Sequence, residues 1–257
     1  MALKYYHAEP LANSLKSMVP LKEKGLCYES IYVDLHKFEQ HQPWFTAINP
    51  EGQVPVLDHD GTIITHTTVI NEYLEDAFPD AQPDSGPLRP RSPVGAARMR
   101  YWNKFVDEHV MNHVSMHGWH RLVGVIARNI EAGEFEKLLA QIPLPDQRKK
   151  WATARSGFSE ADLKNASEKI DYALAKVEKQ LEQTDWLAGD TYTLADINFY
   201  SHCGMMVERM FPEKDVAANY PRLVTWRERV TRRPAVAEAL KSEDRTQPGL
   251  RTWSGDR

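Results

Sequence analysis

The N-terminal third of the chain alternates short apolar runs with amphipathic stretches, and this pattern predicts a small sheet with helices packed on it. Residues 3–7 and 27–33 are rich in β-branched and aromatic types and are predicted to be strands. Between them, residues 13–24 carry apolar side chains at helical spacing, and Gly25 provides a stop signal. The order strand, helix, strand implies a parallel pair with a right-handed crossover.

A second group of elements follows in the order strand, strand, helix. After a short helix expected around 41–48, strands are predicted at 54–58 and 62–65, joined by an Asp-Gly turn of the kind that forms hairpins. From Thr67 onward, apolar residues recur on one helix face, and the threonine can cap that helix. The whole region is therefore predicted to be βαβ followed by ββα.

A proline-rich segment separates this region from a remainder in which only helical periodicity recurs. Residues 79–93 hold five prolines, which cannot continue a helix, so an interdomain linker is predicted there. Helices are predicted over 94–127, 133–142, 146–155, 159–183, 193–211 and 219–241. Thr193 and Asp196 have the spacing of a capping box, and a catalytic role for this aspartate is the weaker alternative. The polar tail after residue 242 is predicted to fray.

Composition and charge narrow the possible functions. At 257 residues, with 42% hydrophobic and 26% charged residues, the chain suits two globular domains. A formal charge of −4 gives no electrostatic reason to expect nucleic acid or an acidic membrane as a partner. The N-terminus lacks a signal-peptide apolar run, and no stretch approaches the roughly 18 apolar residues of a membrane span, so a cytoplasmic location is expected. Cys27 and Cys203 lack a nearby Cys partner, which argues against a dithiol redox site and a zinc cluster.

Three features of the sequence resemble the glutathione transferase superfamily. They are the Gly-Gln-Val-Pro motif within 49–57, the proline-rich linker, and the segment 185–199 with its capping box. The resemblance spans nearly the whole chain. It implies an α/β plus all-α fold: a thioredoxin-like, glutathione-binding domain at 1–80, a linker at 81–92 and a helical-bundle domain at 93–257. It also implies glutathione as co-substrate and a dimer, formed with an identical chain or with a related subunit.

Shorter segments look like the β-etherase branch of that superfamily, found in bacteria that degrade lignin. They lie at 12–16, 37–41, 44–50 and 102–109. The resemblance implies that glutathione displaces an aryloxide from the carbon next to a ketone in a small aromatic substrate. Two alternatives stay open: transfer of glutathione to another electrophile, such as a haloaromatic compound or an epoxide, and a structural subunit with a degenerate glutathione site.

Stabilising the thiolate of glutathione is the main chemical task such a site would have. A free thiol has a pKa near about 8.5, so little thiolate exists at neutral pH unless hydrogen-bond donors or a helix dipole favour it. The resemblance assigns this role to Asn13 and Ser14 at the start of the first helix. Plain helix capping is the alternative for both residues. The absence of a Cys at this position disfavours thiol–disulfide exchange.

The remaining glutathione contacts are also carried over from the family pattern. Gln53, Val54 and Pro55 belong to the motif whose cis-proline leaves the preceding main chain free to pair with the cysteinyl unit as a strand would; an ordinary trans proline is the alternative. Gln40 and His41 resemble residues that hold the glycyl carboxylate; a surface loop is the alternative for the histidine.

One position departs from the family pattern. The helix after the hairpin usually begins with Glu-Ser, which binds the γ-glutamyl end of glutathione, whereas this chain has His66 and Thr67. Thr67 keeps a hydroxyl and the helix N–H groups, but the ammonium loses its anionic partner, which is expected to weaken binding about ten- to a hundredfold. Glu51 adds a negative charge near a dicarboxylate ligand. A heteromeric enzyme in which this chain supports a competent partner would account for both.

A stripe of histidines on the first long C-terminal helix is the candidate wall for the second substrate. His109, His113, His117 and His120 are spaced to share one face. A polar cleft or dimer interface lined by these residues is the preferred interpretation, with Met111, Met116 and Trp119 nearby for an aromatic ring. Zinc or copper binding and general-base catalysis are weaker alternatives, and no metal site is expected.

Overall fold

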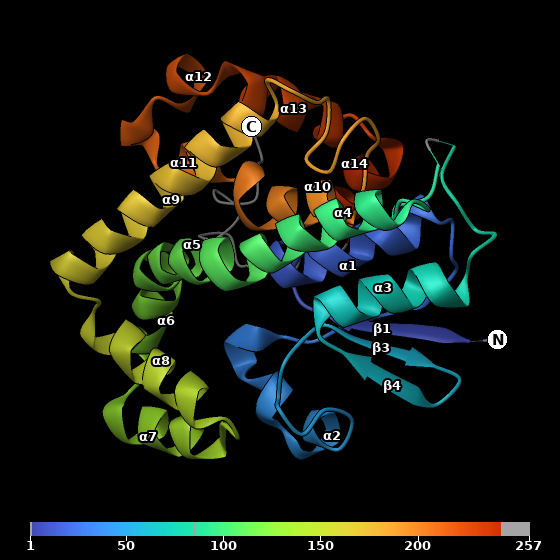
Figure 1. Cartoon of the computed structure of the whole chain (residues 1–257). Coiled ribbons are helices and arrows are strands. Elements are labelled where there is room, and N and C mark those ends of the chain that lie inside the picture. The colour runs from blue at the N-terminus through green and yellow to red at the C-terminus, as the bar shows by residue number, and fades with distance from the viewer. Residues whose placement is uncertain (1, 85, 243–257) are drawn as a thin grey trace.

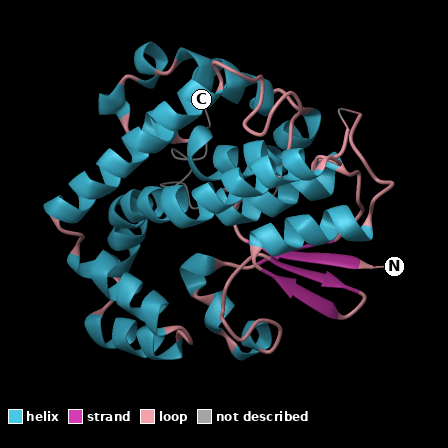
Figure 2. Ribbon diagram, viewed as in Figure 1, coloured by secondary structure: helices cyan, strands magenta, loops and turns pink. Residues whose placement is uncertain are grey.

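The computed structural model describes residues 2–84 and 86–242, and its N-terminal part is built on a four-stranded mixed sheet (Figures 1 and 2). The strands are β1 (Leu3–His7), β2 (Glu29–Tyr32), β3 (Val56–His59) and β4 (Thr62–Thr65). Their order in the sheet is β2-β1-β3-β4, with β1 parallel to β2 and both other pairs antiparallel. The predicted parallel pair and hairpin are therefore both present.

Helices cover both faces of this sheet. Successive side chains of β1 point in opposite directions, so each face presents apolar side chains to the helices on its side. Helices α1 (Ala12–Glu23) and α3 (Thr67–Ala77) lie side by side over one face, where Tyr5 joins the main core (Figure 1). On the other face, Tyr6 packs with Phe45 of the short helix α2 (Pro43–Thr46). Two 3-10 turns, η1 (Leu35–Lys37) and η2 (Glu39–His41), lead into α2.

From Pro93 to Lys241 the described chain is helical, as the sequence predicts (Figure 2). The elements are α4 (Pro93–Phe105), η3 (Val106–Val110), α5 (Met111–Gly118), η4 (Trp119–Val123), α6 (Gly124–Asn129), α7 (Ala132–Gln141), α8 (Pro145–Ser156), α9 (Glu160–Gln180), α10 (Leu194–Phe199), η5 (Tyr200–Gly204), α11 (Val207–Met210), η6 (Pro212–Lys214), α12 (Val216–Asn219), α13 (Pro221–Thr231) and α14 (Pro234–Lys241). The predicted fold class, a thioredoxin-like α/β part followed by a helical part, is confirmed.

Three of the predicted helices differ from regular, continuous α-helices. The helix predicted over 94–127 contains two π-helical turns, η3 and η4, and η5 is a third such turn after α10. The helix predicted over 219–241 is divided into α13 and α14 at Pro234, because a residue that precedes proline disfavours helical backbone. A π turn accommodates an additional residue, so it changes the direction of every side chain beyond it.

The capping box at the start of α10 is confirmed and is fully buried. The Asp196 carboxylate accepts hydrogen bonds from the main-chain N–H groups of Leu187 and Thr193, both at 3.0 Å, and from Trp226 Nε1 at 2.9 Å. The Thr193 hydroxyl also donates to it, at 3.2 Å. These bonds tie the loop before α10 and helix α13 to one side chain.

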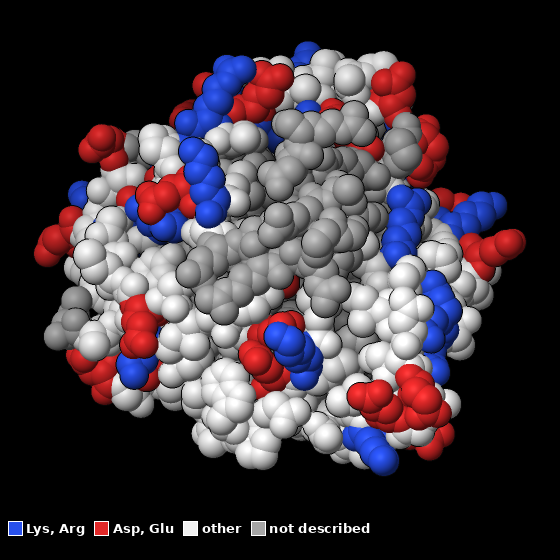
Figure 3. Space-filling model, turned by 180° about the vertical axis from the view of Figure 1, so that it is seen from behind, with Lys and Arg blue, Asp and Glu red and all other residues white. Residues whose placement is uncertain are grey.

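The surface seen in Figure 3 carries acidic and basic side chains interspersed rather than gathered by sign. No helix among residues 2–84 and 86–242 is long and apolar enough to cross a membrane. The polar tail beyond residue 242, for which fraying is predicted, lies outside the described residues.

Candidate functional site

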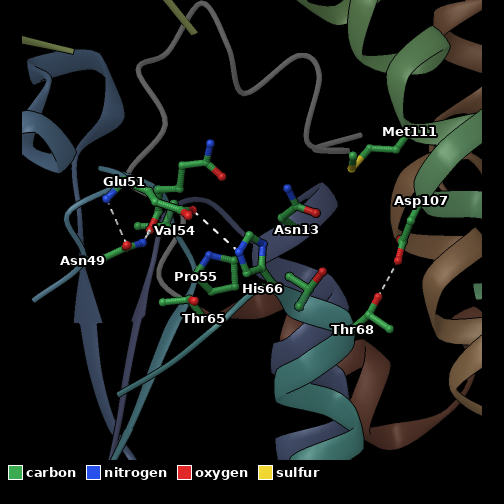
Figure 4. Close-up of a pocket in the computed structure, with 12 residues that line it drawn as sticks. Asn13, Asn49, Glu51, Val54, Pro55, Thr65, His66, Thr68, Asp107 and Met111 are labelled. Carbon is green, nitrogen blue, oxygen red and sulfur yellow. Dashed lines mark hydrogen bonds and ion pairs between the residues drawn. The ribbon is translucent and has the colours of Figure 1, made fainter. Parts of the chain in front are cut away.

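A pocket of about 220 Å³ lies where the sheet, the start of α1, the start of α3 and the α4–α5 helix meet (Figure 4). Its walls are formed by Asn13, Asn49, Glu51, Gln53, Val54, Pro55, Thr65, His66, Thr67, Thr68, Asp107 and Met111. The N-terminal part therefore supplies most of the polar groups, while Asp107 and Met111 come from the helical part.

The loop before β3 faces the N-terminal end of α1, which is the arrangement expected of a slot for a tripeptide thiol. Asn13 on α1 and Val54 and Pro55 on the loop line the same pocket (Figure 4). The Val54–Pro55 peptide bond is cis, as the motif predicts. Val54 precedes strand β3, so its main chain is not committed to the pairing between β3 and β4.

The pocket rim between α2 and β3 is held by Asn49. Its Nδ2 donates to the Gln53 main-chain oxygen at 2.8 Å, and its Oδ1 accepts from the Glu51 N–H at 3.2 Å. Gly52, at the tip, has a φ of +62°, and a Cβ there would lie 2.6 Å from His41 Nδ1. The loop therefore depends on a glycine that lies directly against the histidine.

Gln40 and His41 lie behind this loop and are buried, with exposed fractions of 5% and 7%. Neither is among the residues that line the pocket. Gln40 Oε1 and His41 Nδ1 are buried polar atoms without a hydrogen-bond partner. Burial lowers the pKa of His41 to about 4, so the ring is neutral near pH 7. Such orphan atoms are uncommon and favour a polar ligand or water beside them.

The N-terminus of α3 is open towards the pocket. His66, the N-cap residue, has a φ of +64° and makes no capping hydrogen bond with its side chain. Its Nε2 instead lies 3.6 Å from the carboxylate of Glu51, and both side chains are solvent-exposed. Thr67 and Thr68 follow it along the pocket wall. The first N–H groups of an eleven-residue helix therefore face a cavity that can accept an anion.

An ion pair joins the two halves of the chain at the pocket wall. Lys16 Nζ, buried on α1, lies 2.7 Å from Asp107 Oδ1 on η3 and 2.7 Å from the Thr68 hydroxyl. Asp107 also accepts from Thr68 and, at 3.1 Å, from Asn198 Nδ2. Burial alone would raise the pKa of Asp107, but Lys16 and these donors hold it below its ordinary value. Its negative charge is therefore already neutralised within the protein.

The two residues predicted to contact the thiol differ in where they point. Asn13 lines the pocket, and its Oδ1 lies 3.0 Å from His202 Nε2. Ser14 is buried: its hydroxyl accepts from the Ala8 N–H at 3.1 Å, and its main-chain oxygen accepts from the Tyr5 hydroxyl at 2.6 Å. Of the pair, only Asn13 is among the residues that line the pocket.

None of the residues predicted to form the second substrate's wall is among those that line this pocket. His109 Nε2 lies 3.2 Å from the Lys169 main-chain oxygen on α9, and His113 bonds back to the His109 carbonyl. His117 is buried, with Nε2 3.1 Å from the Ser167 hydroxyl, and Trp119 packs on Trp151 with ring centroids 5.1 Å apart. Met116 is half-buried on the same helix.

The positions of these histidines along the helix explain this: His109 and His113 follow Asp107 and Met111 by two residues, about half a helical turn, so the two pairs lie on opposite sides of the helix. Asp107 and Met111 occupy the pocket instead. Within the described part of the chain, no cluster of three or more His, Cys, Asp or Glu is arranged to hold a metal ion.

Several pocket residues are not singled out by the sequence alone. The sequence assigns no role to Asn49, Thr65 or Thr68, and Asp107 lies within the segment 102–109 without a distinguishing spacing, whereas Met111 is predicted to lie near the aromatic substrate. His202 is missed because its link to Asn13 spans 189 positions. The signal in the sequence that could have identified His202 and Lys16 is a histidine or a lysine within a predicted amphipathic helix.

The buried His202 makes the stability of the protein depend on pH. Burial lowers its pKa to about 4, against an ordinary value of about 6.5, so the folded chain binds fewer protons than the unfolded chain between these values. This contribution is complete above pH 6.5 and is lost as the pH falls towards 4. Between pH 7 and pH 5 it amounts to about 2 kcal/mol of the free energy of unfolding.

Urea unfolding of the wild type and of His202→Phe at these two pH values measures this effect. The loss of stability on acidification is expected to be about 2 kcal/mol smaller in the variant, because phenylalanine cannot take up a proton. An equal loss in both proteins would show that His202 is not buried in its neutral form.

Family models and known proteins similar to this chain all indicate one family. Residues 1–76 match the family model of the glutathione S-transferase N-terminal domain, and residues 140–234 match that of the C-terminal domain. Protein LigF of Sphingobium sp. strain SYK-6 is 41% identical over 248 residues, which is 95% of each chain. Glutathione S-transferase F13 of Arabidopsis thaliana is 26% identical over 91% of this chain and 93% of its own length.

Solved structures agree with these matches. The crystal structure of the β-etherase LigF from Sphingobium sp. strain SYK-6 aligns with a TM-score of 0.90 at 40% identity, covering 95% of this chain and 100% of LigF. A glutathione transferase of Phanerochaete chrysosporium in complex with oxidized glutathione aligns with a TM-score of 0.71 at 18% identity, over 92% of this chain and 94% of its own. The latter shows a shared fold alone.

Proposed function

The chain belongs to the glutathione S-transferase family, and from that membership we propose that it cleaves β-aryl ether bonds of lignin-derived aromatic ketones with glutathione as co-substrate. The observation that carries this proposal is the 41% identity to LigF over 95% of both chains, together with the TM-score of 0.90 to a protein described as a β-etherase. Glutathione S-transferases of lower identity share the fold but differ from this chain in about three residues of every four.

The proposed reaction is a displacement at the carbon that carries the aryloxide. The glutathione thiolate forms a carbon–sulfur bond while the carbon–oxygen bond breaks, and the bonding pair leaves with the aryloxide oxygen. Asn13 would donate a hydrogen bond to the thiolate, and the N-terminal end of α1 would add a favourable dipole. Aligning the two substrates in one pocket lowers the entropic cost of reaching the transition state.

The polar groups around the pocket suit the parts of glutathione. The main chain at Val54 and Pro55, with Gln53 beside it, would pair with the cysteinyl unit as a strand does. The N–H groups at Thr67 would hold the γ-glutamyl carboxylate. The Gln40 NH₂ group and the neutral His41, with its proton on Nδ1, would donate hydrogen bonds to the glycyl carboxylate without adding charge, and the His41 bond would give its unpaired Nδ1 a partner.

The pair formed by Glu51 and His66 is expected to limit glutathione affinity. A double variant, Glu51→Gln with His66→Glu, should bind glutathione about tenfold more tightly, because it gives the γ-glutamyl ammonium an anionic partner and removes a charge that repels the carboxylates. Calorimetric titration measures the dissociation constant. The single variant Glu51→Gln is the matched control and should gain less. A double variant that binds no more tightly than the wild type would contradict this account.

The second substrate would lie between Asn13 and the α4–α5 helix. Met111, a flexible apolar side chain on the pocket wall, suits the flat face of an aryl ring. His109, His117 and Trp119 would act on this substrate only indirectly, since their contacts run to α9, to Phe211 and to α8. The same is proposed for His113 and Met116, which are also not among the residues that line the pocket.

Product analysis tests the proposed function. The purified chain is incubated with glutathione and an aryl ether of an aromatic ketone, and the released phenol and the glutathione thioether are quantified. Equal amounts of the two products are expected. Turnover of haloaromatic compounds or epoxides without ether cleavage would favour the general transferase instead. Activity that arises only after a related subunit is added would favour the structural-subunit alternative, for which the Glu51–His66 pair is the supporting feature.

We further propose a dimer, with an identical chain or a related subunit, in the cytoplasm. Large apolar side chains are exposed on α3, α4 and α9, and they include Val69, Val94, Tyr101 and Tyr172, each more than half exposed. Burying such side chains against a second chain would be favourable, and surface apolar groups of this kind are typical of interfaces. The chain's charge balance favours neither nucleic acid nor membrane as a partner.

A further inference from the structure

The side chain of Asn13 is held by a residue from the opposite end of the chain. His202 lies on the π turn η5, is 6% exposed, and places Nε2 3.0 Å from Asn13 Oδ1. Its Nδ1 lies 3.1 Å from the main-chain oxygen of Asn198. Both partners are carbonyl oxygens, and a carbonyl oxygen accepts hydrogen bonds but cannot donate them.

A neutral imidazole cannot donate to both oxygens, because it carries one proton. The Asn198 carbonyl belongs to the helix backbone and cannot turn, so in the neutral ring Nδ1 carries the proton. Asn13 can then bond to Nε2 only by turning its NH₂ group towards the ring, which points its carbonyl oxygen into the pocket. A ring protonated on both nitrogens donates to both carbonyls and leaves the Asn13 NH₂ group facing the pocket.

The surroundings of His202 decide which of these states prevails. Burial and, to a lesser extent, Lys16 on α1 lower the pKa of the ring to about 4, and the hydrogen bond to the Asn198 carbonyl and the charge of Asp107 on η3 act in the opposite direction. The ring is therefore neutral at pH 7 in the protein without a ligand. A thiolate beside Asn13 changes this balance, since it adds a negative charge nearby and accepts a hydrogen bond from the NH₂ group.

We propose that His202 is a positioning residue that sets which end of the Asn13 amide faces the sulfur of bound glutathione. This inference rests on the proposed function. With neutral thiol in the pocket, the Asn13 carbonyl accepts from S–H. When the S–H bond breaks, its electron pair stays on sulfur and its proton leaves to water, while His202 takes up a proton from water and the amide presents NH₂ to the thiolate. Ionisation of the thiol and protonation of His202 are thereby coupled.

The coupling has a signature that a merely structural histidine would not give. Thiol ionisation accompanied by proton uptake at His202 releases no net proton, so the thiolate fraction falls less steeply on acidification than for a single titrating group. A variant without a titrating group at this position shows an ordinary single titration. Its midpoint is higher because the Asn13 amide is no longer held with its donor towards sulfur.

The test is a pH titration of thiolate ultraviolet absorbance in the complex of the full chain with saturating glutathione. His202→Phe removes both the hydrogen bond and the proton, whereas His202→Gln keeps a donor for Asn13 but cannot titrate. Tyr200→Phe is the matched control, because it removes a buried hydroxyl from the same π turn whose 3.0 Å bond runs to Thr231 on α13. Steady-state kinetics on the same four proteins separate kcat from KM.

We expect a shallow titration in the wild type and in Tyr200→Phe. His202→Phe should titrate as a single group with a midpoint about one unit higher, and its kcat should fall about tenfold with a smaller change in KM for glutathione. His202→Gln should lie between them, also as a single group. A His202→Phe titration identical to that of the wild type would overturn the inference and leave the proposed function intact. Absence of any thiolate signal in the wild type at saturating glutathione would overturn the proposed function itself.

Discussion

Replacing Asp196 by alanine is expected to lower the free energy of unfolding by about 4 kcal/mol. The carboxylate is fully buried and accepts four hydrogen bonds, from Leu187 N–H, Thr193 N–H, the Thr193 hydroxyl and Trp226 Nε1. Each buried donor left without an acceptor costs about 1–3 kcal/mol. Domains of this size are stable by only about 5–15 kcal/mol in total, so the loss is a large fraction.

Two further variants separate the cause of this loss from a change in volume. Asp196→Asn keeps the shape but turns an NH₂ group towards donors, so it should lose most of the same stability. Asp185→Ala, in the loop before α10, removes an exposed carboxylate whose ion pair with Arg229 spans 3.4 Å, and should change stability by less than about 0.5 kcal/mol. Urea unfolding at pH 7 measures all three. An Asp196→Ala loss as small as that of Asp185→Ala would contradict the assigned role.

Replacing Asn13 by alanine is expected to lower kcat/KM about ten- to a hundredfold while the fold is retained. Asn13 lines the pocket, and its amide would be the side-chain donor to the thiolate. A hydrogen bond to a charged group is worth about 1.5–3 kcal/mol, which corresponds to that range of rates. Kinetics with the ketone ether and glutathione measure the effect, and unfolding measurements check the fold.

Comparison with two other residues makes the Asn13 prediction specific. Asn112→Ala removes an exposed asparagine of α5 that bonds to the Glu108 main-chain oxygen, outside the pocket, and should leave kcat/KM unchanged. Ser14→Ala leaves the buried Ala8 N–H without its acceptor, so its main effect should be a loss of about 1–2 kcal/mol in stability. If Asn112→Ala and Asn13→Ala reduced kcat/KM equally, the proposed hydrogen bond from Asn13 to the thiolate would be contradicted.

The local elements were predictable because short-range patterns determine them. Strands 3–7 and 62–65, the start of α3 at Thr67 and the capping box at Thr193 agree with the structure. Each rests on alternation, helical spacing or a capping side chain within a few residues. The family membership was likewise predictable, because its motifs are contiguous in sequence.

The helical wall of the pocket was not predictable in the same way. Helical spacing places the histidines on one face but does not show which face of the helix meets the pocket, and the residues that line it are Asp107 and Met111 on the opposite side. The links between Lys16 and Asp107 and between Asn13 and His202 join residues 91 and 189 positions apart. No local pattern encodes such contacts.

A crystal structure of the chain with bound glutathione tests the central claim most directly. The account predicts the glutathione sulfur within hydrogen-bond distance of the Asn13 amide, the cysteinyl main chain paired with Val54 and the γ-glutamyl carboxylate at the N–H groups of Thr67 and Thr68. Glutathione bound at another surface, or seated in this pocket with its sulfur turned away from Asn13, would contradict it.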